Sequence, residues 1–187
     1  MSNKHDRRSQ RTRHLLGEAL VELMSAKGYN AITVSDIIEH ANVGRSTFYA
    51  HYRDKDNLLV SEFARVVDVL SLHSPRNAAG NLFFPSLGLF QHVGEQHKLY
   101  KALVWGSGAD LPAKYMQRLL CEKIEQGLNE SGRKFDIALP ILANFLAGSF
   151  LTLLRWWMDN KMLYSAEQMD EIFQKLTMPG IEEASIK

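Results

Sequence analysis

The stretch of the chain that decides the expected fold reads Thr33-Val-Ser-Asp-Ile-Ile-Glu-His-Ala-Asn-Val-Gly-Arg-Ser-Thr-Phe-Tyr-Ala-His-Tyr-Arg53. Its first part predicts a helix of about two turns, because Thr33 is a favourable N-cap and Asp36 stands three residues on, where a capping box places its acid. The inward face of this helix is apolar and consists of Ile37, Ile38 and Ala41. The stretch therefore begins with a short helix that needs a partner to pack against.

A second short helix follows in the same stretch. Asn42 ends the first helix, Gly44 opens the second, and Phe48 and Tyr52 share one face of it at i, i+4 spacing. The outward positions carry hydrogen-bond donors and no acid: Arg45, Ser46, Thr47, Tyr49 and His51. Such a set suits phosphates and base edges, so the stretch predicts a helix-turn-helix with residues 44–50 as the recognition helix.

The motif also resembles a particular family. Ala41-x-Val43, followed by Phe48-Tyr49-Ala50-His51 and then Lys55, resembles the DNA-binding domain of the tetracycline-repressor (TetR) family over residues ~8–60. The resemblance implies that Arg45 and Ser46 read base edges, while Gly44 lacks the reading side chain that some members have there. Contacts to the DNA backbone are implied for Thr33, Thr47, Tyr49, His51, Lys55 and, on the first helix, Arg11. For Tyr49 and His51 the alternative is a purely structural ring packed in the head.

Charge is unevenly distributed along the chain. The 187 residues carry a net charge of +1, but residues 1–13 hold five Lys or Arg against Asp6 alone, a net +4, which leaves −3 for the remainder. A basic segment ahead of a mildly acidic body suits phosphate contact at one end, with a solvated tail as the alternative. The lone Cys121 excludes an intramolecular disulfide framework.

Helical periodicity organises the rest of the chain into an all-α protein. We expect a disordered basic arm at 1–8, the helix-turn-helix domain at 9–54, a linking helix at 55–74 and a helical body at 75–187. Within the body, helices are predicted near 85–95, 97–105, 112–131, 137–160 and 167–177, with residues 74–81 as the boundary loop.

The predicted body carries the candidate ligand pocket and the dimer interface. TetR-family bodies bind an inducer, and the candidate pocket residues are Phe90, Trp105, Cys121, Phe145 and Trp156, although plain core or interface packing is the alternative. Residues 137–160 are apolar nearly all round, so something besides their own domain must cover one face. Ala143, Ala147 and Gly148 are expected to permit close approach of a second copy across a two-fold axis.

Other classes of function have little support in the sequence. His92 and His97 flank Glu95 but miss the i, i+4 register of a helical metal site, and no glycine-rich phosphate loop occurs in a strand–turn–helix context. We expect no enzyme activity, metal or cofactor. The apolar segment 137–158 is interrupted by polar residues and Arg155, so we expect a buried helix and a cytoplasmic protein without a membrane span.

The sequence thus predicts a homodimeric transcriptional regulator of palindromic double-stranded DNA, most simply a repressor released by an unknown small-molecule effector. A dimeric DNA-binding or interaction module without an inducer is the alternative. A small helical enzyme is a further alternative, and only the residues around Glu95 would support it.

Overall fold

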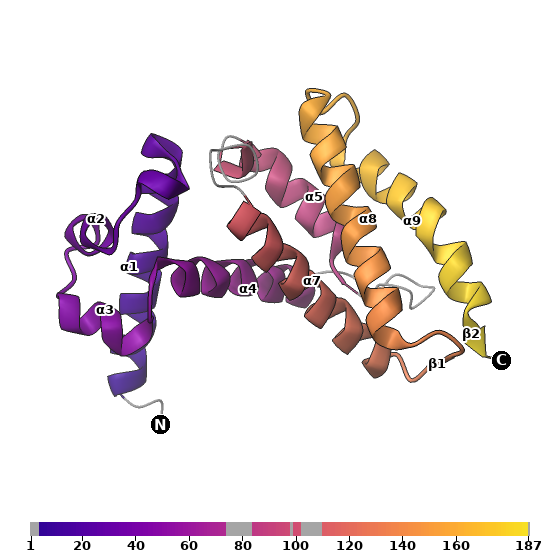
Figure 1. The fold of residues 1–187 in the computed structure, drawn as a ribbon, viewed down its shortest axis with the longest axis horizontal. Coiled ribbons are helices and arrows are strands. Elements are labelled where there is room, and N and C mark those ends of the chain that lie inside the picture. Colours follow the sequence, from indigo (N-terminus) through magenta and orange to yellow (C-terminus); the bar gives the residue numbers. More distant parts are fainter. Residues whose placement is uncertain (1–3, 74–83, 98, 102–109, 187) are drawn as a thin grey trace. The chain divides into compact units, whose positions relative to one another are not determined.

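The computed structural model describes residues 4–73, 84–97, 99–101 and 110–186, and nearly all of these lie in α-helices (Figure 1). They form two compact units, one of residues 4–63, 99–101 and 110–113 and the other of residues 64–73, 84–97 and 114–186. The predicted all-α class, with a helix-turn-helix head and a helical body, is confirmed.

The first unit is built around a small apolar core. Its elements are α1 (Lys4–Lys27), the 3-10 turn η1 (Tyr29–Ala31), α2 (Val34–His40), α3 (Arg45–His51) and the start of α4 (Lys55–His73). Each contributes one apolar face, and the side chains at the centre are almost completely buried: Leu16, Leu20, Met24, Ile32, Ile37, Phe48 and Leu58. Burying these stripes together is what stabilises helices of only seven residues such as α2 and α3, which are too short to be stable alone.

The N-terminal arm differs from its prediction. Residues 1–8 were expected to be disordered, but α1 already begins at Lys4. Once a helix has formed, each further residue adds one backbone hydrogen bond without a new nucleation cost, so α1 extends through a charged segment. The Thr12 hydroxyl also donates to the Arg8 carbonyl at 3.0 Å. Arg7, Arg8, Arg11 and Arg13 therefore project from a helix, and all four are exposed.

Helix α4 belongs to both units. Its bounds are Lys55–His73, where a linking helix was predicted at 55–74, and the division between the units falls within it, after residue 63. The predicted boundary loop at 74–81 and most of the predicted helix at 97–105 lie outside the described residues.

The second unit packs its helices around an aromatic core. Helices α5 (Ser86–Glu95), α7 (Asp110–Glu130), α8 (Leu139–Asp159) and α9 (Ala166–Glu183) supply it, and α9 runs back beside α8 (Figure 1). Ring centroids 4.8–5.7 Å apart connect the core aromatic residues, Phe84, Phe90, Phe150, Trp157 and Phe173. The buried Ser86 hydroxyl donates to Asp170 at 2.5 Å and so ties α5 to α9.

Two details of the body were not foreseen. A two-residue antiparallel pair joins β1 (Lys134–Phe135) to β2 (Ser185–Ile186). Helix α9 also runs past Pro179 to Glu183, beyond its predicted end at 177. Ile181 and Ala184 at that end are 2% and 5% exposed, so their burial outweighs the backbone hydrogen bond that proline removes.

Helix α8 is long and apolar enough to span a membrane by length and composition alone. A third of its most apolar 18-residue segment is buried inside the protein. Its buried face includes Ala143 and Ala147, both 0% exposed. They were expected to permit approach of a second copy, but they pack against their own protomer instead. Gly148 is the small residue on the open side, since a Cβ there would meet nothing within 4 Å.

Candidate DNA-binding interface

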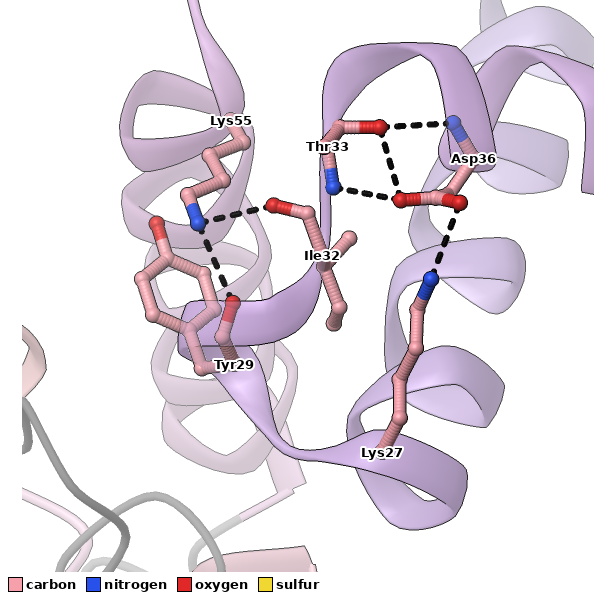
Figure 2. A network of polar contacts seen from close by, with 6 residues as sticks. All are labelled: Lys27, Tyr29, Ile32, Thr33, Asp36 and Lys55. Atoms are coloured by element: carbon pink, nitrogen blue, oxygen red, sulfur yellow. Dashed lines mark hydrogen bonds and ion pairs between the residues drawn. The ribbon is translucent and has the colours of Figure 1, made fainter.

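The N-terminus of α2 forms the predicted capping box. The Thr33 hydroxyl accepts from the Asp36 N–H at 3.2 Å and donates to the Asp36 carboxylate at 2.7 Å, and the Thr33 N–H donates to that carboxylate at 2.6 Å (Figure 2). The other oxygen of Asp36 pairs with Lys27, at the end of α1, at 2.9 Å. Both donors of Thr33 are directed to Asp36, and the phosphate contact predicted for Thr33 stays a prediction. Its role in the structure is to begin α2.

The charge of Asp36 is strongly favoured by this arrangement. The ion pair with Lys27, followed by hydrogen bonds from the hydroxyl and N–H of Thr33, holds the pKa of Asp36 far below its ordinary value of 3.8. The carboxylate is therefore ionised throughout the physiological range, and it joins the end of α1 to the start of α2.

The turn between α2 and α3 is tight and needs one residue in the left-handed region. Asn42 adopts φ 49°, a conformation that asparagine tolerates better than most residues. The Val43 N–H then donates to the Ile38 carbonyl at 2.9 Å, which closes the turn. Gly44 follows as the N-cap of α3 with φ −65°, and a Cβ added to it would meet only the Thr47 hydroxyl oxygen, at 3.6 Å. Neither backbone conformation nor packing requires a glycine at this position.

Helix α3 has one buried and one exposed face, as predicted. Phe48 and Tyr52 are 0% and 5% exposed and anchor the helix in the head. On the opposite side Arg45, Ser46 and Tyr49 are exposed, while Thr47 and His51 are half-buried. The face directed to solvent thus carries hydrogen-bond donors and no carboxylate.

Two of these exposed residues interact with each other. The Arg45 guanidinium carbon lies 5.8 Å from the centroid of the Tyr49 ring, one helical turn on. This is a cation–π distance, so Tyr49 limits the directions that the Arg45 side chain takes. The Tyr49 ring in turn meets Phe48 edge-on, with centroids 5.3 Å apart.

Lys55, for which a phosphate contact was predicted, makes hydrogen bonds within the head. Its ammonium group donates to the carbonyls of Tyr29 and Ile32 at 3.1 and 2.8 Å, and it lies 4.5 Å from the centroid of the Tyr29 ring (Figure 2). Sequence reasoning missed this arrangement, because it depends on a tertiary contact between α4 and η1 that no local motif records.

The candidate pocket residues that the structure describes do not come together. Phe90 is 0% exposed inside the aromatic core. Phe145 and Trp156 are 56% and 45% exposed on the outer face of α8. Cys121 is half-buried on α7, with its sulfur 3.8 Å from the side-chain oxygen of Asn144. Trp105 lies outside the described residues. Phe90, on α5, packs against Phe150 and Trp157 on the buried face of α8, whereas Phe145 and Trp156 lie on the exposed face, so these three residues do not line one pocket.

The outer face of α8 instead carries an apolar stripe. We define this α8 stripe as Ile141, Phe145, Gly148 and Trp156, which lie on one face of the helix with the exposed Thr152 between the last two. Ile141 is 63% exposed, and Leu176 on the neighbouring α9 is 66% exposed. Large apolar side chains are thus exposed on α8 and α9, with the polar Asn144 and Thr152 exposed among them.

The histidines considered as metal ligands show no metal-site geometry. Within the described residues, no three His, Cys, Asp or Glu side chains are placed to hold a metal ion together. His92 is half-buried, and desolvation lowers its pKa below 6.5, with Arg65 acting in the same direction and Glu95 against it.

The fold and this interface define the class of protein. A three-helix head with an exposed donor face on its third helix, joined through α4 to a helical body, is a helix-turn-helix DNA-binding protein. Two sequence models of known families match it: residues 16–61 match "Bacterial regulatory proteins, tetR family", and residues 83–179, more than half of the chain, match "Transcriptional regulator C-terminal region".

Individual relatives agree with these matches. The chain is 39% identical to the uncharacterized HTH-type transcriptional regulator YxbF of Bacillus subtilis over 77 residues, which cover 38% of this chain and only a fifth of that protein. It is 20% identical to the HTH-type transcriptional repressor KstR2 of Mycolicibacterium smegmatis, over 87% of this chain and 86% of the relative.

Solved structures show the same fold. A TetR transcriptional regulator from Streptococcus agalactiae matches with a TM-score of 0.61 and 24% identity, covering 92% of this chain and 97% of that one. Thermus thermophilus FadR, a TetR-family repressor solved with lauroyl-CoA, matches with a TM-score of 0.60 and 20% identity over 89% and 93%. The chain belongs to the TetR family and is a DNA-binding transcriptional regulator.

Proposed function

We propose that the protein is a cytoplasmic, homodimeric repressor that binds a palindromic operator and is released by a small-molecule effector. The observation that carries the proposal is the exposed face of α3. This face carries hydrogen-bond donors and no acidic side chain, and it lies opposite the fully buried Phe48. DNA binding rather than catalysis accounts for this face. The name of the relative KstR2, a repressor, supports the direction of regulation.

The roles of the interface residues follow from their placement. Arg45 and Ser46, at the first turn of α3, are proposed to read base edges, with arginine bidentate to guanine as the commonest such contact. Thr47, Tyr49 and His51 are proposed to bind phosphates and fix the orientation of the head. The exposed Arg11, with its neighbours on α1, would add phosphate contacts that carry no sequence information.

A second copy of the chain is the proposed occupant of the α8 stripe. Reading a palindrome requires two heads about one helical turn of DNA apart, ~34 Å, and a two-fold axis through the bodies supplies them. In a symmetric dimer the α8 stripe of one protomer would contact the α8 stripe of the other. Ile141, Phe145 and Trp156 would therefore be buried in both protomers.

The effector is proposed to be apolar or weakly polar. Thermus thermophilus FadR, whose structure holds lauroyl-CoA, supports an apolar acyl chain as part of such a ligand, although the coenzyme A part is charged. One observation favours the alternative of a module without an inducer. The core aromatic residues of the described body pack on one another, as Phe90 does on Phe150 with ring centroids 4.8 Å apart.

The decisive experiment is selection of binding sequences from a random DNA pool by the purified protein at near-physiological salt. We expect a palindrome whose half-sites are about one turn apart. Binding that depends on salt but not on sequence would refute the proposed operator reading. Acyl-CoA thioesters of increasing chain length would then be titrated against the complex with the selected DNA. Release of the protein from the DNA would support an effector of this kind. Unchanged affinity for the DNA throughout the series would favour a module without an inducer.

A further inference from the structure

Lys55 occupies an enclosed position at the start of α4. Two carbonyl oxygens, of Tyr29 and Ile32, accept from its ammonium group at 3.1 and 2.8 Å. The Tyr29 ring stands against the same nitrogen, 4.5 Å from ring centroid to Nζ (Figure 2). An ammonium group has three donors and no acceptor, so two of its three hydrogen bonds are already made inside the head.

The segment that Lys55 binds leads directly into the helix-turn-helix. Ile32 is 1% exposed and immediately precedes Thr33, the N-cap of α2. Tyr29 is also held from its other end, because its hydroxyl donates to the carboxylate of Asp56, the residue after Lys55. The first turn of α4 therefore holds η1 at both the ring and the backbone of Tyr29.

The N-terminus of α2 is consequently held from two sides. From α1, Lys27 pairs with Asp36 of the capping box at 2.9 Å, and from α4, Lys55 binds the carbonyl one residue before the cap. Since α2 packs on α3, the position of this N-terminus bears on where the exposed face of α3 lies.

We propose that Lys55 is a positioning residue for DNA binding, which acts through the backbone of residues 29–32 and the cap of α2 and not through a phosphate of its own. A move of the ammonium group to DNA would break two hydrogen bonds and leave the buried Ile32 without this donor. The proposal rests on the interface proposed for α3, because it states how that interface is held in place.

The test is the salt dependence of DNA binding by Lys55→Met, which keeps much of the side-chain length and removes the charge. Each cation that contacts a phosphate contributes about 0.9 to the slope of log K against log salt. We expect Lys55→Met to weaken binding to the selected operator roughly tenfold, as for a lost charge-assisted hydrogen bond, with the wild-type slope retained. Arg11→Met is the matched control and should lower the slope by about 0.9.

A second variant removes no cation. Tyr29→Phe removes the hydroxyl that donates to Asp56 and keeps the ring. It should also weaken operator binding, and its effect should combine non-additively with that of Lys55→Met, because both act through Tyr29. All affinities are to be measured where thermal unfolding shows each variant fully folded.

The outcomes separate the alternatives. A slope reduced by about 0.9 in Lys55→Met would show a phosphate contact and overturn the proposal. Unchanged operator affinity in folded Lys55→Met, or additive losses in the double variant, would overturn it as well. If the wild-type protein selected no palindrome, the proposed function would fail, while the slopes of Lys55→Met and Arg11→Met on a random-sequence duplex would still decide the role of Lys55.

Discussion

Phe145 gives a direct test of the proposed dimer, because it lies at the centre of the α8 stripe. It is 56% exposed, and a phenylalanine buries about 200 Å², so roughly 110 Å² of it remains for a partner to cover. At about 25 cal/mol per Å² this amounts to roughly 2.8 kcal/mol per protomer. The residue occurs twice across a two-fold axis, which gives about 5–6 kcal/mol for the dimer.

Phe145→Asp should therefore raise the dissociation constant of the dimer about 10⁴-fold, and burying two like charges would weaken it further. Sedimentation velocity over a dilution series measures the change directly. The control is Leu163→Asp, because Leu163 is 76% exposed, more than Phe145, but lies in the turn between α8 and α9. A Phe145→Asp protein that stayed dimeric, or a Leu163→Asp protein that dissociated equally, would refute the proposed interface.

Three further predictions concern the head. The pKa of Asp36 is lower in the folded chain than in the unfolded chain, so its ion pair stabilises the head above pH 3.8 and this stabilisation is lost as the pH falls below that value. The difference in melting temperature between wild type and Asp36→Asn should accordingly be constant near neutrality and shrink in acid, and a constant difference down to pH 2 would contradict the assigned ion pair. Tyr49→Phe should retain the base preference set by Arg45, whereas Tyr49→Leu, which removes the ring, should weaken that preference about two- to fivefold in competition binding. Gly44→Ser should leave the melting temperature unchanged or higher, since serine is a good N-cap and the position is open, yet weaken operator binding by adding a side chain at the start of α3; unchanged affinity would show that DNA does not approach the backbone there.

The local parts of the head were predictable from sequence. The capping box joins Thr33 and Asp36, which are three positions apart, and α3 is anchored by Phe48 and Tyr52, which are four positions apart, so each appears in the sequence as a short spacing. The hydrogen bonds of Lys55 join residues 23 and 26 positions apart, and no spacing rule indicates them. For the same reason the sequence predicted a phosphate contact for Lys55 and not its hydrogen bonds to two backbone carbonyls.

The body was harder to predict because apolar composition does not say which way a side chain faces. Helix α8 is apolar on both sides, so Phe145 and Ala143 were equally plausible as core or surface. The structure puts the small alanines inside and the large aromatic outside. Only the packing of α8 against its neighbours decides between these faces, and a single helical sequence does not contain that information. The basic start of α1 was likewise predicted to be a disordered arm from its composition. In the structure it is continuous with the apolar part of the same helix.

The adjacent residues Trp156 and Trp157 make α8 a natural optical probe. Trp157 is 3% exposed and its indole N–H donates to the Tyr164 carbonyl at 2.8 Å, whereas Trp156 is 45% exposed. One indole therefore reports the interior of the body through its fluorescence, and its neighbour reports the outer surface of α8. Once the third tryptophan is replaced (Trp105→Phe), quenching by a water-soluble agent such as acrylamide distinguishes the two without any attached dye, so events at the surface and in the core of the body can be followed separately.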